Sequence, residues 1–220
     1  LANGVQLMGR SFKYHRPRGP FTSGSEEPNA IVELREGTRK EPNTRATTTE
    51  LYDDLIAKSQ NKWPSLGFDM MAVNDLFSDF LTAGFYYKTF MWPAAFWEKL
   101  YEPIIRRAAG LGSASLEPDP DSYDKGFLHC DLLIIGAGPA GLAAALVAGR
   151  AGLDIILADE DFLIGGRLNQ ESLRINDQAG SHFAGSTHEE LNNLPNVRVM
   201  TRTTVIGAFD HGIYGLSLIH

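Results

Sequence analysis

The sequence predicts an α/β protein whose parallel sheet lies in the C-terminal half. Two observations carry this prediction. Residues 132–149, LLIIGAGPAGLAAALVAG, contain no charged or hydrogen-bonding side chain. A second apolar run, LDIILA at 153–158, follows at once and ends on the acids Asp159, Glu160 and Asp161. A strand, a glycine-rich turn, a helix and a second strand in this order are typical of a parallel βαβ unit.

Each element of this unit follows from its residue types. Leu132–Ile135 is short and wholly apolar, as expected for a strand buried in a parallel sheet. The alanine-rich stretch Leu142–Ala151 is expected to be a helix, and Leu153–Ala158 the second strand. A membrane-spanning helix of about 18 residues is the alternative for the apolar run. Its four glycines and Pro139 argue against that alternative, so we expect no membrane contact.

The turn between the first strand and the helix has the spacing G-x-G-x-x-G, which in this setting indicates a dinucleotide site. Gly136 allows the sharp turn, Gly138 lets a pyrophosphate approach the backbone, and Gly141 lets the helix pack close to the strand. The amide of Ala140 and the positive end of the helix dipole favour the anion. Asp159 lies 23 residues after Gly136, at the end of the second strand.

The acids after the second strand are expected to meet the adenosine ribose. Asp159 or Glu160 is placed to accept its hydrogen bonds, and an acid there repels a 2′-phosphate, which disfavours NADP. The pair Gly165–Gly166 brings a second backbone stretch against the cofactor, or else forms an ordinary turn. Thr204 and Val205 are expected between two extended segments, in a position to flank an adenine ring. An α/β unit that binds nothing stays open as the alternative.

The chain offers no catalytic or metal-binding motif. No nucleophile stands beside a paired base, and the histidines lack the spacing of metal ligands. The string HEEL at residue 188 is expected to begin a surface helix. We therefore assign no catalytic role and no metal to His182, His188, His211 and His220.

Composition divides the chain into three parts. The expected boundaries give a small loop-rich domain over residues 1–45, a helical, aromatic-rich connecting region over 46–128, and the first part of a dinucleotide-binding domain over 129–220. In the first part Ala30–Leu34 alternates as a strand does. A cluster of basic residues there is expected to lie in an extended segment that is held by ion pairs. The alternative is that the cluster binds an anion. It comprises Arg10, Lys13, His15, Arg16 and Arg18.

The connecting region is expected to begin with an amphipathic helix within residues 47–60, TTTELYDDLIAKSQ. Residues 63–112 concentrate the tryptophans and most other aromatic side chains. Aromatic residues at this density favour a core or a subunit contact over a ligand cage. Residues 113–126, with two prolines and several acids, are expected to be a linker.

Charge and cysteine content exclude several classes. The 20 Lys plus Arg against 27 Asp plus Glu give a net charge of −7, so no nucleic-acid-binding surface is expected. The single Cys130 forms no internal disulfide, so a reducing, cytoplasmic setting is expected. Because the chain begins at Leu1 and ends on an apolar run, we expect a fragment of a longer protein.

Several long strings resemble the alpha subunit of bacterial heterotetrameric sarcosine oxidase. They are GRSFKYHRPRG, GSEEPNA, AGFYYKTFMWP, LYEPIIRRAAGLG, and GAGPAGLAAA with the ADED that follows it. The resemblance covers nearly the whole chain and identifies it as the N-terminal portion of such a subunit. It implies an assembly with beta, gamma and delta subunits. That assembly oxidatively demethylates sarcosine to glycine, forms hydrogen peroxide and passes the one-carbon unit to tetrahydrofolate.

The resemblance also implies cofactors and site residues. FAD belongs to the beta subunit and FMN to the alpha–beta boundary, while the alpha subunit, similar in fold to flavin disulfide reductases, carries NAD. No catalytic residue is implied for this segment. The implied NAD site comprises Gly136, Gly138, Ala140, Gly141, Asp159, Glu160, Asp161, Gly166, Arg167 and Val205.

The first part of the chain further resembles the two-iron ferredoxin-like domain of amine and opine dehydrogenases and of cyanide synthase. In that pattern cysteines fall at about Thr22, Glu27 and Ala30, none of which supplies a thiolate. We therefore expect a scaffold without an iron–sulfur cluster. Two alternatives stay open: a related amine or opine dehydrogenase subunit that binds FAD or NAD, and a structural subunit with an empty nucleotide fold.

Overall fold

The computed structural model describes residues 4–79, 84, 92–172 and 174–218. The chain folds into two compact units. The N-terminal unit comprises Leu1–Thr22 and Glu26–Ser122, and the C-terminal unit comprises Ser23–Ser25 and Tyr123–His220. The domain boundaries expected near residues 45 and 128 stay predictions.

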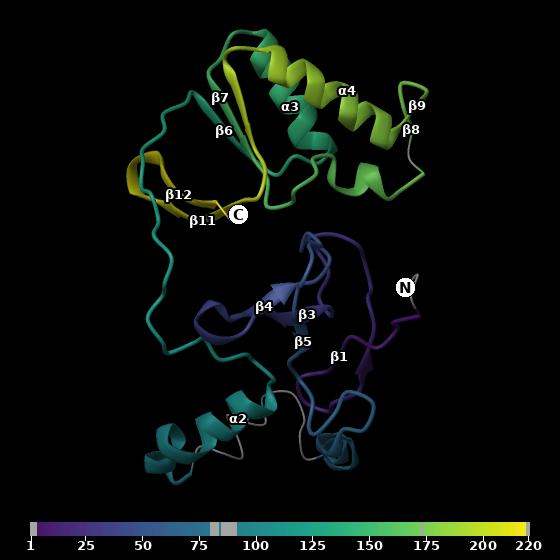
Figure 1. Ribbon diagram of the computed structural model, residues 1–220, viewed down its shortest axis with the longest axis vertical. Coiled ribbons are helices and arrows are strands. Elements are labelled where there is room, and N and C mark those ends of the chain that lie inside the picture. Colours follow the sequence, from purple (N-terminus) through teal and green to yellow (C-terminus); the bar gives the residue numbers. More distant parts are fainter. Residues whose placement is uncertain (1–3, 80–83, 85–91, 173, 219–220) are drawn as a thin grey trace. The chain divides into compact units, whose positions relative to one another are not determined.

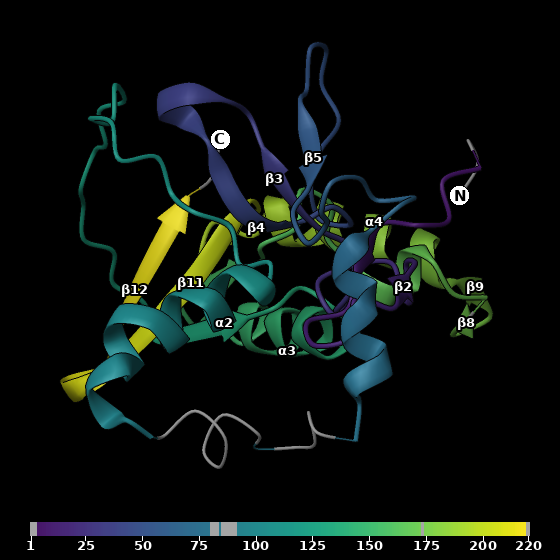
Figure 2. The same cartoon turned by 90° about the horizontal axis from the view of Figure 1, so that it is seen from below.

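Two small antiparallel sheets lie in the N-terminal unit. Their strands are β1 (Gly9–Arg10), β2 (Pro17–Arg18), β3 (Ile31–Leu34), β4 (Glu41–Arg45) and β5 (Ala57–Ser59). β1 pairs with β2. In the other sheet β3 lies between β4 and β5 (Figure 2). Val32 and Leu34 are buried, whereas Ile31 and Glu33 are half-buried. This alternation is that of a strand with one face toward a core, and it confirms the strand predicted at Ala30–Leu34.

The prediction of an amphipathic helix within residues 47–60 is wrong. The end of this stretch is β5, which pairs antiparallel with β3 and places Ala57 opposite Leu34. Asp54 has a φ of +64°, a left-handed conformation that interrupts any right-handed helix. Leu51, expected on the apolar face, is 85% exposed. Pairing with a distant strand outweighs a weak local helical pattern, as is common for short segments.

Residues 111–128 contain no helix or strand, and the described residues between β5 and residue 111 include several short helices. They are η2 (Met70–Phe77), η3 (Ala94–Phe96), η4 (Trp97–Tyr101) and α2 (Glu102–Ala108), with η1 (Gly37–Arg39) earlier in the chain. Among the described aromatic residues, Trp63 and Trp92 are 56% and 83% exposed. These two side chains are therefore not core residues, and the predicted subunit contact stays a prediction. Much of the aromatic-dense stretch, at 80–83 and 85–91, lies outside the described residues.

The C-terminal unit contains a parallel sheet with two α-helices packed on it (Figure 1). Its elements are β6 (Leu132–Ile135), α3 (Pro139–Arg150), β7 (Ile155–Ala158), η5 (Gly166–Asn169), β8 (Arg174–Ile175), β9 (Gln178–Ala179), α4 (Gly180–Asn193), β10 (Val197–Met200), β11 (Thr203–Phe209), η6 (Asp210–Gly212) and β12 (Ile213–Leu218). Cys130 lies half-buried just before the first of these strands.

The strand order of the parallel sheet is β10-β7-β6, so β7 is central and all four of its residues are buried. α3 and α4 pack on this sheet and contribute Leu142 and Leu191 to the core beside Leu157. The predicted strand, turn, helix and strand are confirmed. The helix begins at Pro139, three residues earlier than expected, because the fixed φ of proline suits the first position of a helix.

Two expectations for the last ninety residues are wrong. The string HEEL lies in the second half of α4, because the buried face of this helix extends back through Thr187 and Ala184. Thr204 and Val205 lie inside β11, not between two segments, because β11 and β12 form a continuous hairpin that begins at Thr203. No helix within the described ranges combines the length and the apolar character that crossing a bilayer requires.

Candidate functional site

The turn after β6 presents backbone N–H groups at the start of a helix. Gly136 has a φ of +95°, and its N–H donates to the carbonyl oxygen of Ala158 at 2.8 Å. α3 follows with Gly138 as its N-cap residue, which has no side chain to bond the first amides. First-turn amides such as that of Ala140 have no carbonyl partner within a helix. These unpaired N–H groups lie at the N-terminus of α3, which is the positive end of the helix dipole.

Two glycines of this turn differ in the space around them. A Cβ on Gly141 would lie 1.9 Å from the carbonyl oxygen of Gly136, so only glycine lets α3 approach the turn this closely. A Cβ on Gly138 would meet no atom within 4 Å. The turn is therefore tightly packed at Gly141 and open at Gly138. Open space beside the first amides of a helix suits an anion.

A second glycine loop lies beside the same turn. Gly165 has a φ of +117°, and its N–H donates to the carbonyl oxygen of Ala137 at 2.9 Å. A Cβ on Gly166 would lie 3.3 Å from the Cα of Gly138. Both glycines have left-handed φ values, which favour glycine over other residues. The loop and the turn thus bring two backbone segments together.

Asp159 joins the acidic run to the turn. Its Oδ2 accepts a short hydrogen bond from the N–H of Ala137, and its Oδ1 accepts one from the N–H of Asp161 at 2.8 Å. Its own backbone carbonyl accepts from the N–H of Thr203 at 2.8 Å. The acid therefore lies at the carboxyl end of β7, against the turn and the start of β11.

The next two acids are half-buried beside it. Burial raises the pKa of Asp161, and the N–H groups of Leu163 and Phe162 act in the opposite direction, while the charge of Asp159 raises it further. The net result is a pKa above the usual range for this carboxyl. Negative charge is thus concentrated at one end of β7.

The remaining predicted site residues are less closely tied to the turn. Arg167 follows Gly166 in η5, and its guanidinium forms an ion pair with Glu171 one helical turn later. Val205 lies in β11 opposite Leu216, two residues after the residue that bonds Asp159. The structure therefore brings together six of the ten predicted residues through hydrogen bonds or close approaches: Gly136, Gly138, Gly141, Asp159, Asp161 and Gly166.

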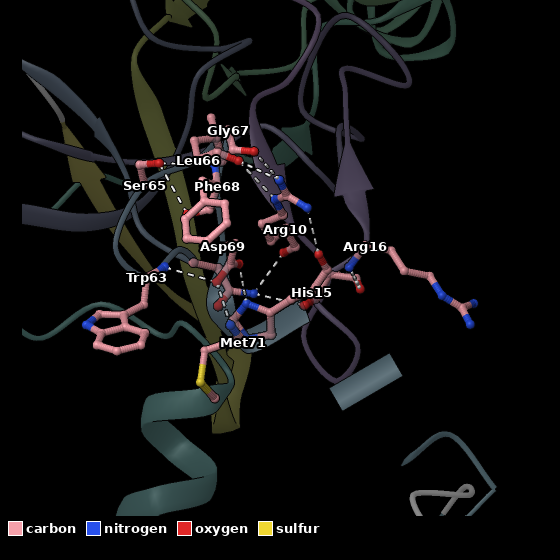
Figure 3. A network of polar contacts seen from close by, with 12 residues as sticks. Arg10, His15, Arg16, Trp63, Ser65, Leu66, Gly67, Phe68, Asp69 and Met71 are labelled. Carbon is pink, nitrogen blue, oxygen red and sulfur yellow. Dashed lines mark hydrogen bonds and ion pairs between the residues drawn. The ribbon is translucent and has the colours of Figure 1, made fainter. Parts of the chain in front are cut away.

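Two members of the basic cluster of the N-terminal unit, Arg10 and His15, bond to the stretch Leu66–Asp69 (Figure 3). Arg10 donates from Nη2 to the carbonyl oxygen of Leu66 at 2.6 Å, and Arg16 pairs with Asp75 at 2.6 Å. The Nδ1 of His15 lies 2.6 Å from Oδ2 of Asp69, with side-chain exposures of 3% and 0%. For Arg16 the expected ion pair is confirmed, and His15 is held by a buried hydrogen bond to Asp69.

Sequence reasoning missed the acid that binds His15. Asp69 lies 54 residues away in the sequence and carries no local pattern that marks it. Its Oδ1 also accepts from the N–H groups of Trp63 and Met71, at 3.2 and 3.0 Å. The aspartate therefore organises the start of η2 as well as the imidazole.

Two family models match this chain. Residues 1–62 match a family described as a 2Fe-2S iron-sulfur cluster binding domain, and residues 131–206 match one described as FAD dependent oxidoreductase. The second match covers the turn, the acidic run and Val205. The first covers both sheets of the N-terminal unit.

These matches correct our expectation about cofactors. We expected NAD in this subunit, FAD and FMN elsewhere in the assembly, and no iron–sulfur cluster. The chain instead matches a cluster-binding family at one end and an FAD-dependent family at the other. The donor atoms present do not fit such a cluster, because residues 1–62 contain no cysteine to supply the usual thiolates.

The resemblance to sarcosine oxidase alpha subunits is confirmed. The chain is 62% identical over 215 residues to the sarcosine oxidase subunit alpha of Rhizobium meliloti, covering 98% of this chain and 22% of that protein. It is 30% identical over 214 residues to the same subunit of Corynebacterium sp. strain P-1, covering 96% of this chain and 17% of that protein. The chain therefore spans about a fifth of the length of these relatives.

One solved structure shares the fold over most of the chain. The L-proline dehydrogenase from P. horikoshii matches with a TM-score of 0.50 and 17% sequence identity, covering 96% of this chain and 30% of that one. At this identity the match shows the fold alone.

Proposed function

The chain is a relative of the sarcosine oxidase alpha subunits, and on this premise we propose that its C-terminal unit binds a dinucleotide through the ADP half. The unit is then the first part of a Rossmann-like domain of the flavin disulfide reductase type. One observation carries the proposal. A Cβ on Gly138, the N-cap residue of α3, would meet no atom within 4 Å, whereas a Cβ on Gly141 would overlap the backbone of the turn. The turn therefore leaves space beside the first backbone N–H groups of α3, where a pyrophosphate can approach.

The proposed contacts follow from this geometry. The pyrophosphate lies over Gly138 and accepts from the amide of Ala140 at the positive end of α3. The adenosine ribose donates to Asp159 or Glu160 at the end of β7. Both oxygens of Asp159 already accept one hydrogen bond each, but a carboxylate has about four acceptor positions. Capacity for the ribose hydroxyls therefore remains.

The other predicted site residues take supporting roles. Gly136 and Gly141 shape the turn, while Asp161 adds negative charge that repels a 2′-phosphate. Gly166 brings its backbone near the pyrophosphate. Arg167 and Val205 are proposed at the edge of the site, since they lie in η5 and β11 and not in the turn itself.

The ADP half is common to FAD and NAD, and the residues above contact only that half. The match of residues 131–206 to an FAD-dependent family favours FAD. When bound, a flavin would supply redox chemistry. This chain supplies binding and orientation, and we assign it no catalytic residue.

The whole protein is proposed to be an oxidoreductase that acts on sarcosine. The support is the 62% identity to a sarcosine oxidase alpha subunit. By the same resemblance it assembles with beta, gamma and delta subunits. The assembly produces glycine and hydrogen peroxide and transfers the one-carbon unit to tetrahydrofolate. Sarcosine-dependent hydrogen peroxide formation by the purified complex tests this proposal, and a complex that oxidises proline but not sarcosine would replace it.

The nucleotide proposal is tested by Gly138→Val in the full-length protein. A Cβ at this position meets no atom within 4 Å, and a branched side chain would occupy the place of the pyrophosphate. Gly185→Val is the matched control, because Gly185 lies on the exposed side of α4, where a Cβ also meets no atom within 4 Å. Nucleotide released from each protein by acid is identified and counted by mass spectrometry.

We expect one ADP-containing dinucleotide per chain from the wild type and from Gly185→Val, and none at this site from Gly138→Val. FAD is the expected species, and NAD would change the ligand but not the site. A Gly138→Val protein that is fully loaded would overturn the proposal.

A further inference from the structure

Among the residues that the structure describes, no side-chain cation pairs with the buried carboxylate of Glu27 in the N-terminal unit. Glu27 is 1% exposed. An isolated carboxylate is expensive to bury, so other groups must stabilise its charge.

Backbone amides surround this carboxylate from two sides. Oε2 of Glu27 accepts from the N–H groups of Phe21 and Thr22, at 2.6 and 2.5 Å. Oε1 accepts from the N–H of Asn29 at 2.7 Å, and the N–H of Ala30 also bonds the carboxylate. The donors come from residues before and after Glu27, so the chain wraps around its own side chain.

Convergent backbone N–H groups form an anion-binding concavity of the kind called a nest. Hydrogen bonds to an ionised acceptor are about twice as strong as those between neutral groups. Burial acts to raise the pKa of Glu27, but the N–H groups of Thr22, Asn29, Phe21 and Ala30 together outweigh it. The pKa of this carboxyl therefore lies below its usual range, and the group is ionised at neutral pH.

We propose that the segment Phe21–Ala30 is an anion-binding loop and that the anion it holds is the carboxylate of Glu27. The loop is organised by a negative charge at its centre, not by an apolar core. It follows that removing the side chain leaves a site for a small external carboxylate. The carboxylate of Glu27 and the residues that donate to it belong to the N-terminal unit, whereas Ser23–Ser25 of the same segment belong to the C-terminal unit.

Glutamine is an informative replacement because both carboxylate oxygens face N–H donors. In either orientation the amide NH₂ of Glu27→Gln points at one of these donors, although its size and shape are nearly unchanged. Glu27→Asp keeps the charge but shortens the side chain by one methylene. An anion-binding loop must therefore tolerate Asp better than Gln.

The experiment is hydrogen exchange, read by mass spectrometry on peptides that cover residues 18–32 of the full-length protein. Wild type is compared with Glu27→Ala, Glu27→Gln and Glu27→Asp. Glu26→Ala is the matched control, because Glu26 is an exposed glutamate next to the buried one. Each protein is measured with added sodium formate and with sodium chloride at the same ionic strength.

We expect these peptides to exchange about tenfold faster or more in Glu27→Ala and Glu27→Gln, since local opening sets exchange. Glu27→Asp and Glu26→Ala stay closer to wild type. Formate restores slow exchange in Glu27→Ala, and chloride does not. Three results would each overturn the proposal: unchanged exchange in Glu27→Ala, restoration by chloride as complete as by formate, or Glu27→Gln as slow as Glu27→Asp. The comparison of Glu27→Gln with Glu27→Asp tests the proposal even if Glu27→Ala does not fold.

Discussion

The carboxylate of Asp159 accepts a hydrogen bond from the backbone N–H of Ala137, which ties the end of β7 to the turn after β6. Its second oxygen accepts from the N–H of Asp161 at 2.8 Å. Each oxygen thus faces an amide donor. An acid at this position therefore shapes the turn before any ligand arrives, besides being placed to receive a ribose.

Asp159→Asn is expected to weaken both functions. The side-chain NH₂ must face one of the two amide donors, which costs about 1–3 kcal/mol of unfolding free energy. Loss of the charge weakens dinucleotide binding by roughly 10- to 150-fold, since hydrogen bonds to charged groups are worth about 1.5–3 kcal/mol. Denaturant unfolding and nucleotide titration measure the two effects. Asp210→Asn, an exposed aspartate of the same unit, serves as the control and should change neither quantity.

Gly141→Ala is expected to destabilise the C-terminal unit. Its Cβ would overlap the carbonyl oxygen of Gly136, so α3 must move away from the turn at a cost of about 1–3 kcal/mol. Gly185→Ala places the same methyl group in open space on α4 and should be neutral or slightly stabilising. Equal midpoints of chemical unfolding for the two variants would contradict the close packing at Gly141.

Asp69→Ala is expected to lower the free energy of unfolding much more than Asp75→Ala. Asp69 is buried, bonds the imidazole of His15 and accepts two backbone N–H groups, so its removal leaves buried donors unsatisfied at about 1–3 kcal/mol each. Asp75 pairs with Arg16 where the side chains are 44% and 53% exposed, and such pairs contribute about 0–1 kcal/mol. Thermal unfolding of both variants tests this. Similar losses would mean that burial does not set the strength of these pairs.

Asp161→Asn is expected to stabilise the protein at neutral pH. A carboxyl whose pKa is higher in the folded chain than in the unfolded chain destabilises the fold once it ionises. This cost is absent below the unfolded value near 3.8, grows as the pH rises from there to the folded pKa, and is fully present above the folded pKa. Asn removes the charge and still accepts the N–H of Phe162 through Oδ1.

The gain should be up to about 1 kcal/mol at pH 7 and should vanish near pH 3. Unfolding curves at both pH values measure it, with Asp124→Asn as the exposed control. A loss of stability at pH 7 would show that the charge of Asp161 has a favourable partner.

The parts of the fold that the sequence predicts are those with strong local patterns. The apolar run before Gly136 and the spacing to Asp159 predict β6, α3 and β7, because each element depends mainly on its own residues. The helix expected before Gln60 fails because that stretch takes its conformation from β3, a partner far away in the sequence.

Buried polar partners were equally invisible to sequence reasoning. Glu27 entered only as a position that lacks a cysteine, and nothing in GSEEPNA distinguishes the buried Glu27 from the exposed Glu26. Which of two adjacent glutamates turns inward depends on where the surrounding amides converge. That information exists only once the loop has closed.

The strand order β10-β7-β6 also sets an order of events during synthesis. β7 is the central strand, yet one of its two neighbours, β10, ends only at Met200. A ribosome therefore releases β6 and β7 well before it releases the strand that covers the second edge of β7. During that interval the nascent chain exposes the unpaired edge of β7 next to apolar side chains. Chaperones bind such a surface, and it can also pair with a neighbouring nascent chain on the same mRNA.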